Sequence, residues 1–169
     1  GEYPKLIKGP DIFVKTVELI AKDFPVKVIL TGPARGYIKK ELYKRNIRFK
    51  HIFLDRYEDI VDYYHALDLY IISSREEGGP RAVLESMACG IPLITTDCGM
   101  AIDLVDHGKT GWKVDLEDSE GLAHWAKFVA NNIEDSKKVI TNARQVAVKN
   151  SYMNQIPLWE KFMKGFVDK

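Results

Sequence analysis

The sequence has little cysteine, little net charge and no long apolar run. Two cysteines, Cys89 and Cys98, are too few for a disulfide framework or a cysteine-rich metal site. A formal net charge of +1 gives no electrostatic reason to expect a nucleic-acid partner. No apolar stretch has the length of a transmembrane helix, and the N-terminus lacks the pattern of a signal peptide. These absences predict a cytoplasmic protein with reduced thiols.

What the sequence does contain is an alternation of strand and helix patterns. The hydrophobic fraction of 46% is ordinary, and 169 residues can bury one core, so residues 1–169 are predicted to form a single domain. Apolar periodicity and turn residues give the element boundaries. Helices are predicted at 11–22, 38–45, 57–66, from residue 80, at 101–105 and at 119–130, with two more at the C-terminal end; strands are predicted at 26–30, 47–53, 69–72, 92–95 and 112–114.

The predicted strands are short and mostly apolar without alternation, which is typical of a parallel sheet covered by helices on both faces. We therefore expect an α/β domain with a doubly wound parallel sheet. In such domains ligands bind beyond the carboxyl ends of the strands. Three predicted loops lie there, at residues 32–33, 54–56 and 76–79.

The segment that follows the third strand carries the strongest chemical indication. Pro80 suits the first position of a helix, because its missing N–H has no partner there in any case. The amides of Gly78, Gly79 and the first helical turn should therefore point at one spot and favour an anion. Two carboxylates, Glu77 and Glu85, flank this spot. They are better suited to accept hydrogen bonds from hydroxyl groups, such as those of a sugar, than to contact a phosphate.

This segment resembles the retaining, nucleotide-sugar-dependent glycosyltransferases of the group 1 (family 4) type. Their signature is a Glu, seven residues and a second Glu, here Glu77 and Glu85, followed by a turn that reads Met-Ala-Cys-Gly-Ile-Pro at 87–92. The Asp-His-Gly-Lys-Thr-Gly segment at 106–111 is a further match. The resemblance extends at low density from Lys8 to the last helix.

The resemblance implies a GT-B architecture, in which two Rossmann-like halves face each other across a cleft. This chain looks like the C-terminal, donor-binding half, and the N-terminal, acceptor-binding half is absent. The segment 152–166 resembles the terminal helix that crosses back toward that other half. Simple core packing is the alternative explanation for its aromatic residues.

The resemblance also assigns roles at the donor. Glu85 would accept hydrogen bonds from the ribose hydroxyls, and Glu77 would hold the hydroxyls of the transferred sugar. Gly78 and Gly79, with Pro80 at the helix start, would let the backbone approach the donor closely.

A cation and two loops complete the predicted site. Lys8 would neutralise the pyrophosphate, where negative charge grows as the nucleoside diphosphate departs; a plain surface turn is the alternative. The family's usual Arg just upstream is missing, and Lys5 is the nearby cation that could replace it. Gly32 would lie beside the nucleotide, unless it is an ordinary turn, and the loop at Leu54 would meet the base.

The predicted activity is sugar transfer from a nucleoside diphosphate sugar to an acceptor hydroxyl, with retention at the anomeric carbon and no metal or cofactor. We expect the isolated domain to be inactive alone. A nucleotide-sugar epimerase of the same fold and a non-catalytic nucleotide-sugar-binding module are the alternatives. The sequence does not specify the base, the sugar, the acceptor or the oligomeric state, and it leaves membrane association of the full-length protein open.

Overall fold

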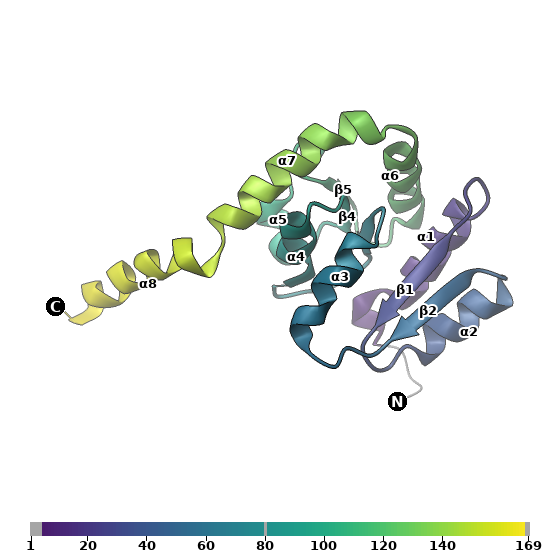
Figure 1. The fold of residues 1–169 in the computed structure, drawn as a ribbon, viewed down its shortest axis with the longest axis horizontal. Coiled ribbons are helices and arrows are strands. Elements are labelled where there is room, and N and C mark those ends of the chain that lie inside the picture. The colour runs from purple at the N-terminus through teal and green to yellow at the C-terminus, as the bar shows by residue number, and fades with distance from the viewer. Residues whose placement is uncertain (1–4, 80, 168–169) are drawn as a thin grey trace.

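The computed structural model describes residues 5–79 and 81–167, which fold into parallel strands covered by helices (Figure 1). The strands are β1 (Lys27–Thr31), β2 (Arg48–Ile52), β3 (Tyr70–Ile72), β4 (Leu93–Thr96) and β5 (Trp112–Val114). The helices are α1 (Pro10–Ile20), α2 (Gly36–Lys44), α3 (Ile60–His65), α4 (Arg81–Cys89), α5 (Met100–Leu104), α6 (Ser119–Asn131), α7 (Ile133–Lys149) and α8 (Tyr152–Val167), with short 3-10 turns η1 (Leu6–Lys8) and η2 (Tyr57–Asp59).

All strand pairs are parallel, as predicted. The strands form two separate hydrogen-bonded sheets, called the two ladders below, in place of one continuous sheet. β1 pairs with β2, while β3, β4 and β5 pair in that order. A strand as short as β3 offers few backbone groups on each edge, so packing rather than a ladder joins the two parts. β4 is fully buried, as expected of a strand covered on both faces. β2 has only exposed and half-buried residues, and it lies at an edge of its sheet.

Helix α1 packs against both ladders and joins them into one core. Its Ile12 and Ile20 belong to a buried cluster with Ile94 of β4 and Trp112 of β5. Its Val17 belongs to a second buried cluster, which includes residues of β1 and α2. One side of α1 thus packs against the ladder of β3, β4 and β5, and another side packs against the ladder of β1 and β2. This arrangement fixes the N-terminal turn η1 relative to the strand ends.

Two predicted boundaries differ in detail. The helix predicted at 57–66 divides into η2 and α3. The helix predicted to begin with Ser119 as its N-cap is capped by Asp118, whose side chain accepts a hydrogen bond of 2.7 Å from the amide of Gly121. Pro80, predicted at the start of α4, lies outside the described residues.

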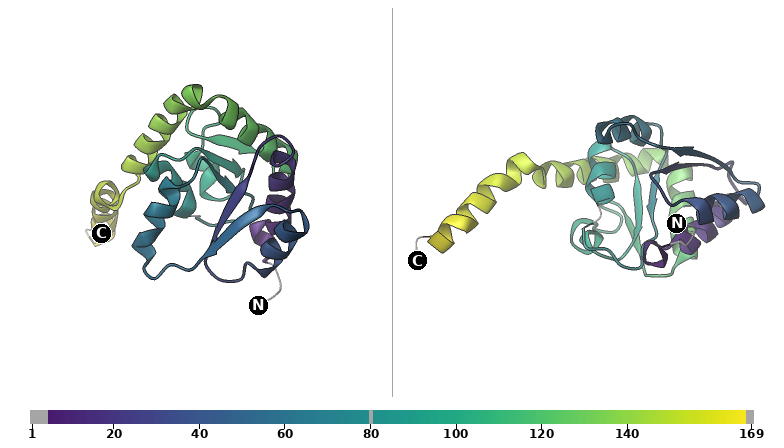
Figure 2. Two further views of the ribbon diagram at one scale, coloured as in Figure 1. Left: turned by 45° about the vertical axis from the view of Figure 1, so that its right-hand side comes forward. Right: turned by 90° about the horizontal axis from the view of Figure 1, so that it is seen from below.

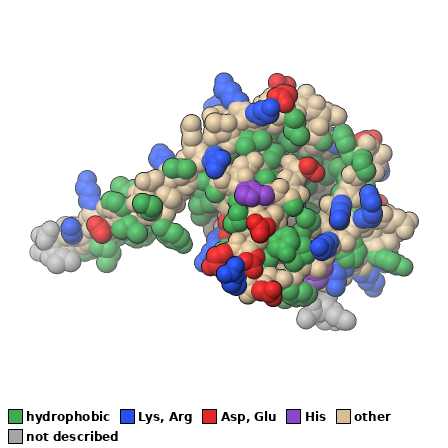
Figure 3. All heavy atoms as spheres, viewed as in Figure 1, with side chains coloured by type: hydrophobic (Ala, Val, Ile, Leu, Met, Phe, Trp, Pro, Cys, Tyr) green, Lys and Arg blue, Asp and Glu red, His purple; other side chains and the backbone are tan. Residues whose placement is uncertain are grey.

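The last helix, α8, extends away from the rest of the molecule (Figures 1 and 2). Its aromatic side chains are largely exposed, with Trp159 63% and Phe162 56% accessible. The space-filling view shows apolar side chains gathered along this helix (Figure 3). Core packing within this chain therefore does not explain the aromatic residues of α8.

Candidate functional site

The predicted loops follow the carboxyl ends of β1, β2 and β3. The register of the first ladder pairs Thr31 with Ile52, so the two following loops begin side by side. The amide of Gly32 donates to the carbonyl of Ile52 over 3.3 Å, and Nε2 of His51 lies 2.7 Å from the carbonyl oxygen of Gly32. Gly32 has a φ of +75°, a left-handed conformation that favours glycine. Leu54 follows in the second loop and is half-buried.

Lys8 and Glu77 meet across the third loop, 69 positions apart in the sequence. The Lys8 Nζ lies 2.5 Å from both carboxylate oxygens of Glu77. The hydroxyl of Ser74 donates to Oε1 of the same carboxylate over 2.8 Å. The Glu77 side chain is only 10% accessible, whereas that of Lys8 is 53% accessible. The carboxylate is therefore fixed from within the fold, and the ammonium group faces solvent.

Two glycines with left-handed φ angles let these segments approach. A Cβ on Gly9 (φ +57°) would lie 1.8 Å from the carbonyl oxygen of Ser73. A Cβ on Gly99 (φ +54°) would lie 2.4 Å from the carbonyl oxygen of Glu77. No other residue fits at either position without moving the backbone of the Glu77 loop. The hydroxyl of Ser73 also donates to the carbonyl of Gly9 over 2.9 Å.

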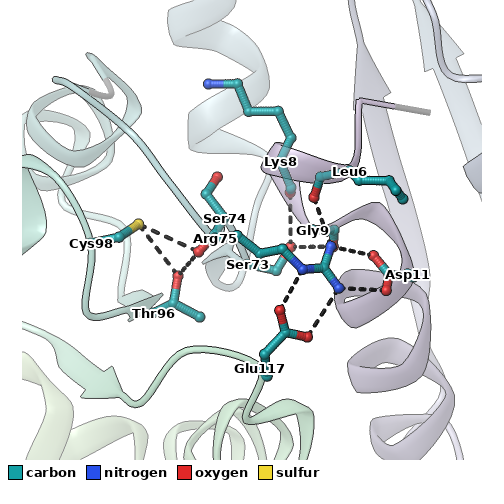
Figure 4. A network of polar contacts seen from close by, with 10 residues as sticks. All are labelled: Leu6, Lys8, Gly9, Asp11, Ser73, Ser74, Arg75, Thr96, Cys98 and Glu117. Carbon is teal, nitrogen blue, oxygen red and sulfur yellow. Dashed lines mark hydrogen bonds and ion pairs between the residues drawn. The ribbon is translucent and has the colours of Figure 1, made fainter.

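Arg75 ties the same loop to the N-terminal turn (Figure 4). Its guanidinium donates to both carboxylate oxygens of Asp11, over 2.8 and 2.6 Å, and to the carbonyl of Leu6 over 2.7 Å. It also pairs with Glu117, and its backbone amide donates to the carbonyl of Ile7 over 2.8 Å. The hydrogen bond from Arg75 lowers the pKa of Asp11. Arg75 thus holds the segment that carries Lys8 beside the segment that carries Glu77.

The base of this loop is anchored in the core. The hydroxyl of Thr96 donates to the carbonyl of Ser74 over 2.6 Å, and the thiol of Cys98 donates to the same carbonyl over 3.4 Å (Figure 4). Ser74, Thr96 and Cys98 are all buried. Burial raises the pKa of the Cys98 thiol, so it stays protonated as a donor.

Glu85 on α4 is held by two tyrosines that the sequence analysis did not identify. The hydroxyl of Tyr57 donates to Oε1 of Glu85, and the hydroxyl of Tyr64 donates to Oε2 over 3.0 Å. The hydrogen bond to Glu85 raises the pKa of Tyr57, and burial raises that of Tyr64. Both phenols therefore stay protonated at neutral pH. No spacing rule could have found these contacts, because the partners lie 28 and 21 positions from Glu85.

The charges of Glu77 and Glu85 both affect the pKa of one tyrosine, Tyr70. Tyr70 of β3 is half-buried, and desolvation raises its pKa, with further contributions from the charges of Glu85 and Glu77. The Tyr70 ring lies 5.3 Å from that of Tyr64, measured between centroids. The tyrosine that holds Glu85 therefore packs against a second tyrosine, at the start of β3.

The predicted glycines Gly78 and Gly79 are exposed. A Cβ on Gly78 would meet no atom within 4 Å, and a Cβ on Gly79 would lie 3.3 Å from Cε of Met100. Neither has a left-handed φ angle. The fold of this chain therefore requires glycine at neither position. Pro80, the next residue of the predicted site, lies outside the described residues.

Within residues 5–79 and 81–167, no group of three or more His, Cys, Asp or Glu side chains is arranged to hold a metal ion. In the same ranges, every helix is too short or too polar to cross a lipid bilayer. The chemistry available at the site is that of one exposed ammonium group and two carboxylates held by hydroxyl donors. Such a set can neutralise an anion and accept hydrogen bonds from hydroxyl groups.

Sequence comparison gives one family for most of the chain. The sequence model described as glycosyl transferases group 1 matches residues 4–146. The lipopolysaccharide core biosynthesis mannosyltransferase LpsB of Rhizobium meliloti is 30% identical over 125 residues, which cover 68% of this chain and 36% of that protein. The N-acetyl-alpha-D-glucosaminyl L-malate synthase of Bacillus anthracis is 25% identical over 147 residues, 86% of this chain and 38% of that protein. The chain thus spans little more than a third of these relatives.

Solved structures share the fold. The C-terminal domain of a group 1 glycosyl transferase family protein (LpcC) from Francisella tularensis matches with a TM-score of 0.76 at 18% identity, over 87% of this chain and 81% of that one. Anabaena Alr3699/HepE, in complex with UDP and glucose, matches with a TM-score of 0.82 at 20% identity, over 98% of this chain and 46% of that one. At these identities the likeness concerns the fold alone.

Proposed function

Because the chain belongs to the group 1 glycosyl transferase family and has the fold of a GT-B C-terminal domain, we propose that it is the donor-binding half of a sugar-transferring enzyme. The whole enzyme would move a sugar from a nucleoside diphosphate to an acceptor hydroxyl, with retention at the anomeric carbon. An N-terminal half outside these 169 residues would bind the acceptor. Its contact surface on this chain would include α8, whose apolar side chains are exposed.

The observation that carries this proposal is the placement of Lys8 against Glu77. The cation and the carboxylate come from segments far apart in sequence, and Gly9 and Arg75 hold those segments together. In the proposed complex, Lys8 turns to the pyrophosphate and stabilises the negative charge of the departing diphosphate. Glu77, fixed by Ser74, then accepts hydrogen bonds from the sugar hydroxyls.

We propose the remaining donor contacts from the family's signature and from the loops at the strand ends. Glu85 would accept hydrogen bonds from the ribose hydroxyls, and the loops at Gly32 and Leu54 would contact the nucleoside. Gly78 and Gly79 need no left-handed backbone, and the space beside Gly78 is open. The donor diphosphate would approach the backbone closely at this point, where a side chain would block it. We also propose a cytoplasmic location, which the free thiols of Cys89 and Cys98 support.

A thermal-shift panel tests the proposal. A ligand that binds only the folded chain stabilises it by RT ln(1 + [L]/Kd), about 2.7 kcal/mol at a hundredfold excess over Kd. Solved structures of this fold hold UDP or UDP-glucose, so UDP, GDP, ADP and their sugar conjugates form the panel. At least one diphosphate should raise the melting temperature, and its sugar conjugate should raise it further.

A double variant, Lys8→Met with Glu85→Ala, should lose the shift. The matched control is Lys137→Met with Glu134→Ala, which removes an exposed pair on α7 with an Nζ to Oε2 distance of 2.6 Å. An equal shift in both double variants would contradict the proposed function, and so would a panel in which no form of the protein, wild type or variant, shows a shift.

A further inference from the structure

Each oxygen of the Glu85 carboxylate already accepts a hydrogen bond from a hydroxyl group of this chain. Tyr57 of η2 donates to Oε1, and Tyr64 of α3 donates to Oε2. A phenol and a ribose hydroxyl are the same kind of donor to a carboxylate. Two protein side chains thus donate to Glu85 in the way that the two hydroxyls of a ribose diol would.

The two tyrosines differ sharply in burial. Tyr64 is 3% accessible and belongs to the interior, whereas Tyr57 is 52% accessible. Tyr57 is held at its position by Glu85 and by Arg81, whose guanidinium carbon lies 5.9 Å from the centroid of the Tyr57 ring. Arg81 is itself exposed. Moving Tyr57 breaks its contacts with Glu85 and Arg81 near the surface, whereas moving Tyr64 would open the core.

A ligand that reaches Glu85 from solvent therefore meets Tyr57 first. A carboxylate offers roughly four lone-pair positions, so the Tyr64 hydrogen bond can persist when a ligand hydroxyl arrives. The hydroxyl of Tyr57, in contrast, stands on the accessible side of the same carboxylate. Release of Tyr57 to water costs one hydrogen bond to the carboxylate, and hydration of the exposed phenol offsets only part of that cost.

We propose that Tyr57 is a built-in competitor for the ribose subsite: its hydroxyl occupies Glu85 in the free protein and is displaced when the donor ribose binds. Tyr64 is a positioning residue that holds the carboxylate in place for the incoming diol. This inference rests on the proposed role of Glu85 in donor binding. It makes the hydroxyl of Tyr57 oppose donor binding and that of Tyr64 assist it.

Two substitutions that each remove one hydroxyl test this difference. Tyr57→Phe should bind the best diphosphate among UDP, GDP and ADP about 3- to 10-fold more tightly than the wild type, because no hydrogen bond must be broken first. Tyr64→Phe should bind it more weakly by a similar factor. Isothermal titration calorimetry on the full chain measures both, and unfolding curves without ligand report any change in stability.

The 2′,3′-dideoxy form of the same diphosphate is the control ligand. Its affinity should be nearly the same in the wild type, Tyr57→Phe and Tyr64→Phe, since it presents no diol to Glu85. A change shared by both ligands in Tyr64→Phe would indicate a structural role only and overturn its assignment as a positioning residue.

The outcomes separate this inference from the proposed function. If the wild type binds a diphosphate and Tyr57→Phe binds it equally or less well, the competitor role is wrong while donor binding stands. If Tyr57→Phe alone binds detectably, the competitor role is supported. If no variant and no wild-type sample binds any diphosphate of the panel, the proposed function fails and the competitor role fails with it.

Discussion

At the scale of single residues, the two carboxylates of the site have different partners and should respond differently to substitution. Glu85 lies among tyrosine hydroxyls, and Glu77 lies against a lysine ammonium group. Glu85→Ala should weaken nucleoside diphosphate binding by roughly 1.5–3 kcal/mol, the range for hydrogen bonds to a charged group. The 2′,3′-dideoxy ligand should bind the wild type poorly and be indifferent to the change. Equal losses for both ligands in a calorimetric titration would rule out the ribose role.

Glu85→Gln shows whether the loss of affinity in Glu85→Ala results from a folding defect. The substitution keeps an acceptor oxygen for the buried Tyr64 hydroxyl, whereas Glu85→Ala leaves that hydroxyl without its partner. A buried donor without a partner costs about 1–3 kcal/mol. We expect Glu85→Gln to unfold at nearly the wild-type urea concentration and still to bind the ribose-containing ligand more weakly.

The Glu77 substitution should separate the sugar from the diphosphate. Glu77→Ala releases Lys8, so affinity for the bare diphosphate should stay near the wild-type value or rise. The advantage of the sugar-bearing donor over the bare diphosphate should fall, because the acceptor of the sugar hydroxyls is gone. In the full-length enzyme, kcat/KM should drop by more than diphosphate affinity does. A loss for bare diphosphate as large as for the donor would place Glu77 in the phosphate loop or in folding alone.

Glu77 and Glu85 could be proposed from a local sequence pattern with a chemical meaning, and Lys8 from the family resemblance. Sequence reasoning did not identify Tyr57 or Arg75. Their contacts join segments that are remote in sequence, and a Tyr at the start of a predicted helix is equally well explained by core packing. The tertiary structure alone makes those partners visible.

At the scale of elements, the approach of η1 to the loop after β3 depends on Gly9. Gly9→Ala would place a methyl group against the carbonyl oxygen of Ser73, in a left-handed conformation. Backbone strain and overpacking together should lower the free energy of unfolding by about 2–4 kcal/mol. Gly36→Ala at the start of α2 is the matched control, since a Cβ there meets nothing within 4 Å. It should be neutral or stabilise by up to about 1 kcal/mol. Urea unfolding of both variants measures the difference, and similar costs would refute the close-contact argument.

Helix α8 should contribute little to the stability of this chain. Its side chains at Trp159, Phe162 and Phe166 are between 56% and 67% accessible, so few apolar contacts are lost when the helix is removed. Deleting residues 152–169 should change the free energy of unfolding by less than about 1 kcal/mol, a shift in Tm under about 4 °C. Self-association, measured by light scattering, should fall because an exposed apolar surface is removed. A large loss of stability would show that α8 belongs to this core.

The order and type of the elements were predictable because each has a strong local pattern, as in the fully buried β4 and the apolar face of α1. The division of the strands into two ladders was not, since it depends on how α1 packs between them. The cap of α6 was missed by one residue, because Asp118 and Ser119 are both good N-cap residues and only the geometry distinguishes them.

At the scale of the whole molecule, the family and the α/β architecture that the sequence predicted are confirmed. The arrangement also supports the proposal that this chain supplies the donor side of the reaction. Glu77 and Glu85, two of the groups proposed to contact the donor, follow β3 in the chain, and Lys8 pairs with Glu77. Positioning an acceptor hydroxyl in line with the anomeric carbon lowers a barrier by roughly 7–11 kcal/mol in the best cases. We assign that positioning to the N-terminal half.

The isolated chain should therefore fold and bind donor but transfer no sugar efficiently. Its own core, built on α1 and the two ladders, supports folding alone. With the acceptor free in solution, donor and acceptor meet only by chance in an open, wet site, and slow hydrolysis of the donor is the expected residual reaction. The purified chain and the full-length protein, incubated with the best-binding donor and a panel of acceptors, provide the comparison. Because the missing term is acceptor positioning, the two should share donor affinity and differ by orders of magnitude in transfer rate. Comparable transfer rates would mean that an acceptor site lies within these 169 residues.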